Sequence, residues 1–342
     1  MQLMLINALL LAAGLVLALL TLADVFQTVV VPGGSKASLK VAKRLLFVLL
    51  PIWKRARGRR RGLSDAFAPL VLVLCFLIWM TLLAIAFGLM CYTGRSDFDP
   101  PLRSFFDAVY IVGSSLVTVG LSQSNPAGGA RWIVLAAGFC GLAVMTMAVT
   151  YLLEVQGSVS RRDIGIVKLN TSAGDPPSAL TLLERFASIR NTAALRQDLE
   201  ESRNWCATVR QSHSNHPSLI YFQSISTGAG WPAALGAMLD LALIAEYLID
   251  DDKLFGPAVL LRDEGSRMAT ELAHVIGLRP KEAKTEPAEI SQLIARLESS
   301  GYSLRSAPNV EAMAQHRADH MSCVEALAAH LGRPATVLVR QS

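Results

Sequence analysis

Charged residues are scarce in this sequence. Only 17% of the 342 residues are Asp, Glu, Lys or Arg, whereas soluble domains carry about 25%. Hydrophobic residues make up 52%, and the mean hydropathy is +0.40. This composition excludes an ordinary soluble enzyme and indicates an integral membrane protein.

Signatures of disulfide, zinc, nucleotide and catalytic sites are also missing. The five cysteines have no paired spacing, which argues against a disulfide framework or a zinc ribbon. No G-x-G-x-x-G follows a strand-like run, so a nucleotide-binding domain is not expected. No Ser/His/Asp or Cys/His arrangement has a strand–turn–helix context. We therefore expect no enzymatic activity, no cofactor and no bound metal. His316, His320 and Cys323 share one helical face, but solvated surface explains them better than metal ligation.

Three runs without charged residues are long enough to cross a membrane, which takes about 20 helical residues. They are Met1–Ala23, Ala66–Gly94 and Trp132–Leu153. The sequence therefore predicts an all-α membrane protein with three transmembrane helices and a mainly helical domain after them.

Basic residues are concentrated between the first two of these runs. Residues 32–64 contain ten Lys/Arg and no Asp or Glu. Short loops of this kind stay in the cytoplasm, which places the N-terminus outside and residues 161–342 inside. Anionic lipid headgroups explain such a basic run, and no nucleic acid is expected as a partner. Within it, Lys40–Trp53 is predicted to be an interfacial helix.

Residues 108–130 also lack charge, but they do not read as a crossing. Their apolar part ends near Val119, and glycine, serine, asparagine and proline follow. A helix over Phe105–Val117 spans only about 20 Å, and Ser104-x-x-Asp107 matches a capping box at its start. Because irregular backbone at membrane depth must be buried in protein or line a wet cavity, we expect a re-entrant pore loop.

The order span, half-helix, loop and span resembles the two-transmembrane pore module of the potassium-channel superfamily. The resemblance covers roughly Ala66–Val159 and centres on the sequence SLVTVGLSQ at residues 115–123. This stretch is similar to the filter motif T-x-T-V-G-Y-G-D of that family.

The resemblance implies a homotetramer in a bacterial inner membrane that passes monovalent cations, with potassium favoured. Backbone carbonyls would form the ion-binding rings, contributed by Thr118, Val119, Gly120 and Leu121. The residues implied to support this filter are Ser114, Ser122 and Gln123.

The sequence departs from the family at Leu121-Ser122-Gln123, where the family has Tyr-Gly-Asp. Ser122 then replaces a glycine of positive φ, a strain of about 1–2 kcal/mol per chain. A hydrogen bond between Ser114 and Gln123 would replace an ionised pair. Three outcomes follow: potassium selectivity, weakly selective monovalent conduction, or a collapsed filter.

Two further features lie within the predicted spans. Gly138 and Gly141 in the third span suit either a gating hinge or close helix packing. Asp24 is an intramembrane charge, for which we expect a structural ion pair with the basic loop.

The sequence divides into four regions. Residues 1–31 are an N-terminal transmembrane helix, 32–64 the basic loop, 65–160 the pore module and 161–342 a helical cytoplasmic domain. In the last region helices are expected at Ser178–Gln211, Ala233–Ile249, Asp263–Ile276, Pro287–Ser299 and Val310–His330, and short strands at Leu219–Phe222 and Ala335–Val339.

Two functions fit this organisation. The first is a tetrameric channel that is assembled or gated by its cytoplasmic domain. The alternative is a non-conducting membrane sensor or scaffold that keeps the pore architecture and acts through that domain.

Overall fold

A computed structural model describes the chain except for residues 32–40, 57–66, 224–226, 284–286 and 340–342. Residues 32–40 and 57–64, about half of the predicted basic loop, therefore lie outside the described residues. Among the described residues, three helices are long and apolar enough to cross a membrane, as predicted. They are α1 (Gln2–Val29), α4 (Phe67–Thr93) and α6 (Ala130–Ala173).

The chain divides into two compact units, Met1–Val155 and Gln156–Ser342. The first unit holds α1, α4 and the first part of α6, together with five shorter elements among the described residues. These are α2 (Val41–Ala56), the 3-10 helix η1 (Arg95–Asp97), β1 (Phe98–Asp99), α5 (Phe105–Leu116) and β2 (Asn125–Pro126). The interfacial helix predicted at Lys40–Trp53 corresponds to α2.

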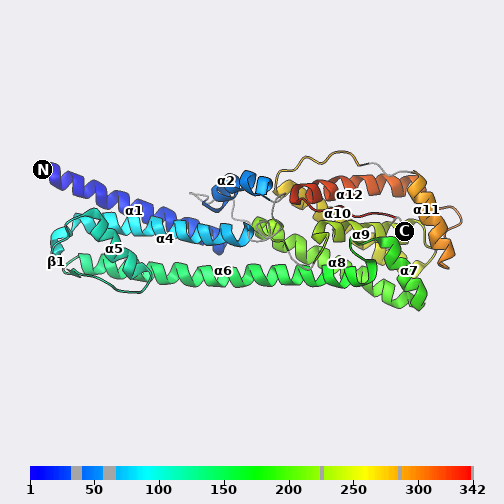
Figure 1. Cartoon of the computed structure of the whole chain (residues 1–342), viewed down its shortest axis with the longest axis horizontal. Coiled ribbons are helices and arrows are strands. Elements are labelled where there is room, and N and C mark those ends of the chain that lie inside the picture. The colour runs from blue at the N-terminus through cyan, green and yellow to red at the C-terminus, as the bar shows by residue number, and fades with distance from the viewer. Residues whose placement is uncertain (32–40, 57–66, 224–226, 284–286, 340–342) are drawn as a thin grey trace. The chain divides into compact units, whose positions relative to one another are not determined.

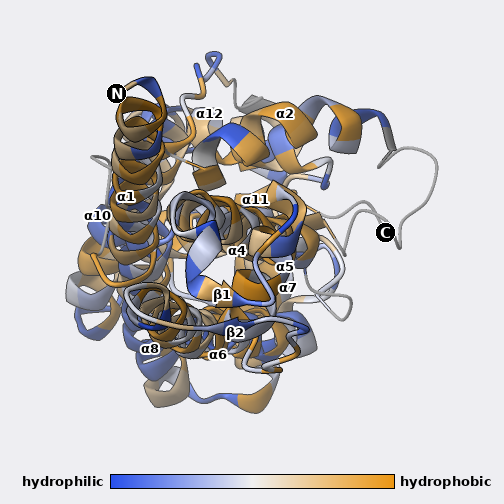
Figure 2. Ribbon diagram, turned by 90° about the vertical axis from the view of Figure 1, so that its left-hand side faces the viewer, coloured by the Kyte–Doolittle hydropathy of each residue, from blue (hydrophilic) through white to orange (hydrophobic). Residues whose placement is uncertain are grey.

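α1 lies directly against α4. A Cβ atom on Gly14 would come within 2.5 Å of the Ala86 carbonyl oxygen, so only glycine permits this approach. α1 has apolar residues around its whole circumference, as Figure 2 shows, and most of them are exposed. This pattern is expected of a helix surrounded by lipid.

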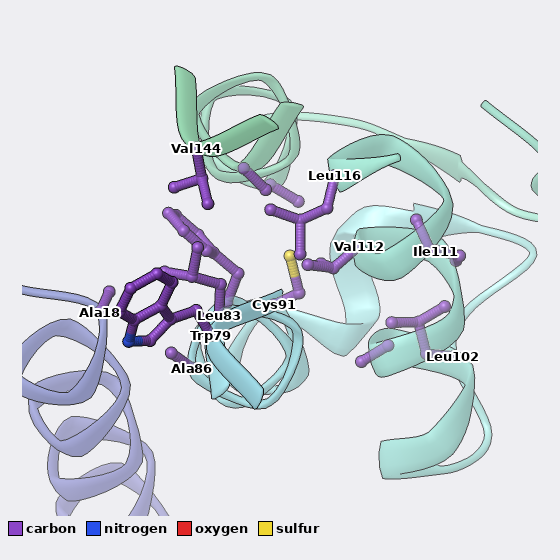
Figure 3. Close-up of a cluster of buried hydrophobic side chains, with 14 of the residues drawn as sticks. Ala18, Trp79, Leu83, Ala86, Cys91, Leu102, Ile111, Val112, Leu116 and Val144 are labelled. Carbon is purple, nitrogen blue, oxygen red and sulfur yellow. The ribbon is translucent and has the colours of Figure 1, made fainter. Parts of the chain in front are cut away.

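The core of the first unit is formed by side chains from all three long helices and α5. Trp79 and Leu83 of α4 meet Val112 and Leu116 of α5 and Val144 of α6 (Figure 3). Each of these five side chains is at most 2% exposed. The core therefore fixes α5 between α4 and α6.

α6 is longer than predicted. The apolar run ends at Leu153, but the helix continues to Ala173 (Figure 1). One face stays buried along the extension, at Val155, Arg162, Ile166, Leu169 and Ala173. From Gln156 onwards the extension is part of the second unit, and α6 continues without a break from the first unit into the second.

The second unit is mainly helical, as predicted. Besides the end of α6 it contains, among the described residues, the 3-10 helix η2 (Pro217–Tyr221) and six α-helices. The helices are α7 (Ala179–Ile189), α8 (Thr192–Asn215), α9 (Gly230–Tyr247), α10 (Asp252–Val275), α11 (Pro287–Ser299) and α12 (Val310–Leu331). α9 packs against α7, α8, α10 and α12, and every residue from Gly230 to Glu246 is buried.

Three local predictions for this unit were wrong. Ser178–Gln211 is two helices, because Arg190 adopts a left-handed conformation (φ +49°) and Asn191 caps α8. Leu219–Phe222 contains the end of a 3-10 helix, Pro217–Tyr221, instead of a strand. Residues 335–339 form no strand. Short apolar runs of this kind have no periodicity that separates a strand from another buried segment.

Arg162 anchors the extension of α6 within the second unit. It is 1% exposed, and its guanidinium donates to the carbonyls of Leu219 (3.2 Å) and Phe222 (2.9 Å). It also pairs with Asp163 at 3.0 Å. His213 lies 3.4 Å from the same guanidinium.

This arrangement predicts a pH dependence of stability. Burial and the charge of Arg162 lower the pKa of His213 to about 3, whereas an unfolded histidine titrates near 6.5. The folded state therefore stays neutral at this site while the unfolded state gains a proton, and stability falls as the pH drops from about 6.5 towards 3. At pH 5 the loss is roughly 2 kcal/mol.

Urea unfolding of the full chain in detergent at pH 7.5 and pH 5 measures this effect. His213→Gln removes the titrating group and is expected to lose less stability over the same interval. Equal losses in both proteins would refute the assignment to His213.

Candidate functional site

The candidate site is the segment that follows α5. Ser104 Oγ accepts from the Asp107 amide (3.2 Å), and Asp107 Oδ2 accepts from the Ser104 amide (2.8 Å). The predicted capping box is thus confirmed and fixes the start of α5. The helix has 12 residues, about 18 Å, and it ends at the buried Leu116.

The four backbone amides after α5 all point back to its last turn. They donate as follows: Val117 to Gly113 (3.1 Å), Thr118 to Ser115 (2.9 Å), and Val119 and Gly120 to Ser114 (2.8 and 3.1 Å). Their donors are therefore satisfied within the chain.

The carbonyls of the same segment have no such partners. In the described part of the chain, the carbonyl oxygens of Thr118, Val119 and Gly120 accept no hydrogen bond. All three residues are exposed. The loop therefore presents unsatisfied acceptors on one side, with its donors turned to the other.

The backbone angles explain this separation. Thr118 (φ +60°) and Gly120 (φ +69°) are left-handed, and Val119 between them is not. Alternation of handedness brings successive N–H groups to the same side, here around the Ser114 carbonyl. The carbonyl groups are then left to the opposite side.

The strained residue is not the one that we predicted. Ser122 has no positive φ, and its hydroxyl donates to the Ser124 carbonyl. Instead the β-branched Thr118 carries the left-handed conformation, at a cost of about 1–2 kcal/mol. Such outliers cluster at functional sites because the surrounding structure must hold them in place.

Ser114 contacts the loop differently from our expectation. Its hydroxyl lies 2.9 Å from the Ile111 carbonyl and 2.7 Å from the Leu121 carbonyl. The expected hydrogen bond to Gln123 is absent between these two described residues. The Leu121 carbonyl is consequently engaged, unlike the three before it.

Gly138 and Gly141 lie where α6 meets the end of α5. A Cβ on Gly141 would come within 2.0 Å of the Leu116 carbonyl oxygen, and one on Gly138 within 3.0 Å of Ser115 Oγ. Ser115 also donates to the Val134 carbonyl at 3.0 Å. Of the two roles left open by the sequence, the geometry favours close packing, which here fixes the residues that precede Thr118.

Asp24 is fully buried in the first unit. Trp79 Nε1 donates to its carboxylate at 2.9 Å, and the Val41 amide at the start of α2 does so at 3.3 Å. The carboxylate thus connects α1, α4 and α2. Asp24 stands out in the sequence as a charge within an apolar run, but Trp79 does not, because an indole in an apolar run gives no sign of its partner.

No metal site is present among the described side chains. They include no group of three His, Cys, Asp or Glu placed to hold an ion. His316 contacts the Tyr247 ring (6.0 Å between centroids), whereas His320 is buried with Nε2 3.8 Å from Asp240. His316 and His320, which share one face of α12, therefore have separate surroundings.

Comparison with known proteins identifies the same region. Residues 71–156 match a family model described as ion channel, the two-transmembrane, potassium-channel-like pore domain. The match begins in α4, includes α5 and the loop, and ends in α6. No curated protein and no solved structure shows significant similarity to the chain.

Proposed function

We propose that the ion-channel domain at residues 71–156 conducts monovalent cations, with potassium favoured, through a homotetrameric pore. The observation that carries this proposal is the row of free carbonyls at Thr118, Val119 and Gly120. Oxygens of this kind replace the hydration shell of a cation. The strained, left-handed backbone conformation of Thr118 keeps these carbonyl groups exposed.

Several copies are needed to complete such a site. One chain supplies a single row of oxygens on one side of the loop, whereas a dehydrated cation must be surrounded. Val119 is 57% exposed and Leu121 58%, and irregular backbone at membrane depth requires protein or water around it. Four loops around one axis satisfy both requirements.

The orientation of α5 also favours a cation. Its C-terminal end, at Leu116, carries the negative end of the helix dipole, worth about 0.3–1 kcal/mol per helix in exposed settings. In the proposed pore α5 enters the membrane and turns back without crossing. Four such ends would act on the same ion.

We infer that the pore selects only weakly for potassium over other monovalent cations, because of the position of the Leu121 carbonyl. Its carbonyl is engaged by Ser114 at 2.7 Å, which leaves three free rings where the family resemblance implied four. In this proposal Ser114 supports the loop, and Ser122 and Gln123 form its outer end.

The remaining regions fit a cell-membrane protein, proposed here to lie in a bacterial inner membrane. With three crossings, the N-terminus and the second unit lie on opposite sides. The basic residues at 32–64 place that loop and the second unit in the cytoplasm. The second unit is proposed to assemble or gate the tetramer through the continuous α6.

The reversal potential of reconstituted protein under potassium/sodium bi-ionic conditions tests this proposal. We expect a potential displaced towards that of potassium but short of it. Ser114→Ala frees the Leu121 carbonyl, and since a hydrogen bond is worth about 0.5–1.5 kcal/mol, the permeability ratio should rise roughly two- to tenfold.

The matched control is Ser188→Ala, which removes a similar local hydrogen bond in the second unit and should leave the potential unchanged. Absence of flux for every monovalent cation would refute conduction. The alternative, a non-conducting membrane sensor or scaffold that acts through its second unit, would then be favoured.

A further inference from the structure

α2 presents an unpaired face with a regular pattern. Its exposed residues recur at the spacing of one helical face. Six of them lie on that face, Arg44, Phe47, Val48, Pro51, Ile52 and Arg55, which we call the α2 stripe; Lys54, beside it, is also exposed. Phe47 is 80% exposed, Val48 62% and Ile52 61%.

The opposite face of α2 packs against the other helices of the first unit. Val41, Ala42 and Leu45 contact the apolar core there. Trp53 is 3% exposed, and its ring stacks on Phe67 at 5.1 Å. The α2 stripe is therefore held outward by contacts on the other side of the helix.

The start of α2 is attached to the transmembrane helices. The Val41 amide donates to Asp24, which also accepts from Trp79 of α4. Because α1 and α4 cross the membrane, this contact keeps α2 near the end of the spans. An exposed apolar helix face near the ends of the transmembrane helices lies beside lipid.

The charge around the stripe has one sign. Arg44, Lys54 and Arg55 are exposed. In the part of the chain that the structure describes, their side chains form no hydrogen bond or ion pair. The sequence has no acidic residue between Asp24 and Asp65. The stripe therefore combines an apolar centre with free cations at both ends, eleven residues apart, or about 16 Å along the helix.

We propose that the α2 stripe is a docking surface for anionic phospholipids of the adjacent leaflet. Phe47, Val48 and Ile52 enter the boundary between headgroups and acyl chains, as in other interfacial helices. Arg44 at one end, and Lys54 and Arg55 at the other, hold separate phosphate groups. A second copy of the stripe is excluded as the occupant because it would bring these cations together.

This inference rests on residence in the membrane and not on conduction, so its test needs no ion flux. Val48→Cys is labelled with bimane in the full chain and reconstituted into vesicles of phosphatidylcholine alone, or into a series of vesicles with increasing fractions of phosphatidylglycerol. The unsubstituted protein supplies the background, since four of its cysteines are buried and Cys140 is partly so.

We expect a larger blue shift of the bimane emission with phosphatidylglycerol. In the triple variant Arg44→Gln, Lys54→Gln, Arg55→Gln, the anionic fraction needed for half of the shift should rise roughly threefold or more, because each basic residue near the surface contributes to attraction. The control is Arg185→Gln, Arg190→Gln, Arg203→Gln, which removes three exposed, unpaired cations from the second unit and should behave like the parent.

Three results would overturn the proposal. One is an equal shift in both kinds of vesicle. Another is an equal rise, in the control with substitutions at Arg185, Arg190 and Arg203, of the anionic fraction needed for half of the shift. The third is a shift that follows protein concentration instead of lipid composition, which would show a protein at the stripe.

Discussion

Gly141→Ala is expected to reduce cation flux at least tenfold. The new Cβ would lie 2.0 Å from the Leu116 carbonyl oxygen and 2.7 Å from its Cα. Because these are backbone atoms, either α6 or the end of α5 must move. Leu116 is followed directly by the loop whose free carbonyls define the proposed pore, so the displacement reaches Thr118. Flux into liposomes measures the effect.

Gly157→Ala is the matched control on the same helix. Its Cβ would meet only Arg161 Nη1, at an ordinary 3.6 Å, and alanine favours a helix over glycine by about 1 kcal/mol. Flux should stay within twofold of the parent. If Gly141→Ala conducts normally while remaining folded, the close approach of α6 does not position the filter.

The second large effect concerns stability. Asp240 of α9 is fully buried and accepts from Arg317 of α12, with Nε–Oδ1 2.8 Å and Nη2–Oδ2 3.4 Å. Burial alone would raise the pKa of Asp240, but the charges and hydrogen bonds of Arg317 and His320 together outweigh burial and lower the pKa. The pair therefore stays ionised within the core of the second unit.

Asp240→Ala leaves Arg317 as a buried charge without this partner, which costs about 3–5 kcal/mol. Amides of α9 that exchange through opening of the second unit should exchange roughly 100-fold faster or more. Hydrogen exchange of the full chain in detergent measures this locally, without interference from the spans.

Two further variants separate the ion pair from general disruption. Glu201→Ala breaks the exposed Lys168–Glu201 pair, whose side chains are 69% and 48% exposed, and should cost less than about 1 kcal/mol. Asp240→Leu with Arg317→Met removes both charges and should recover most of the loss. A large loss that persists in the double variant would assign the effect to packing instead.

The length of α6 shows where local pattern stops being informative. Hydropathy marked its end at Leu153, since the residues beyond it are polar and charged. The helix continues because Ile166 and Leu169 are buried in the second unit. Arg162, which reads as a cytoplasmic charge in the sequence, is 1% exposed and bonded to the Leu219 and Phe222 carbonyls.

The sequence by itself determined the three spans, the capped half-helix at Ser104–Asp107 and the resemblance around Thr118. These depend on long apolar runs and on groups three residues apart, which are local properties of the chain. Only the tertiary structure decided that Thr118 and not Ser122 is left-handed, that Ser114 engages Leu121, and that Asp24 meets Trp79. The Asp24–Trp79 contact joins residues that are 55 positions apart, and contacts between distant segments leave no periodic trace in a sequence. The loop after α5 has neither helical nor strand periodicity, so the Thr118 backbone angle and the Ser114–Leu121 contact follow only from how the loop folds back on α5.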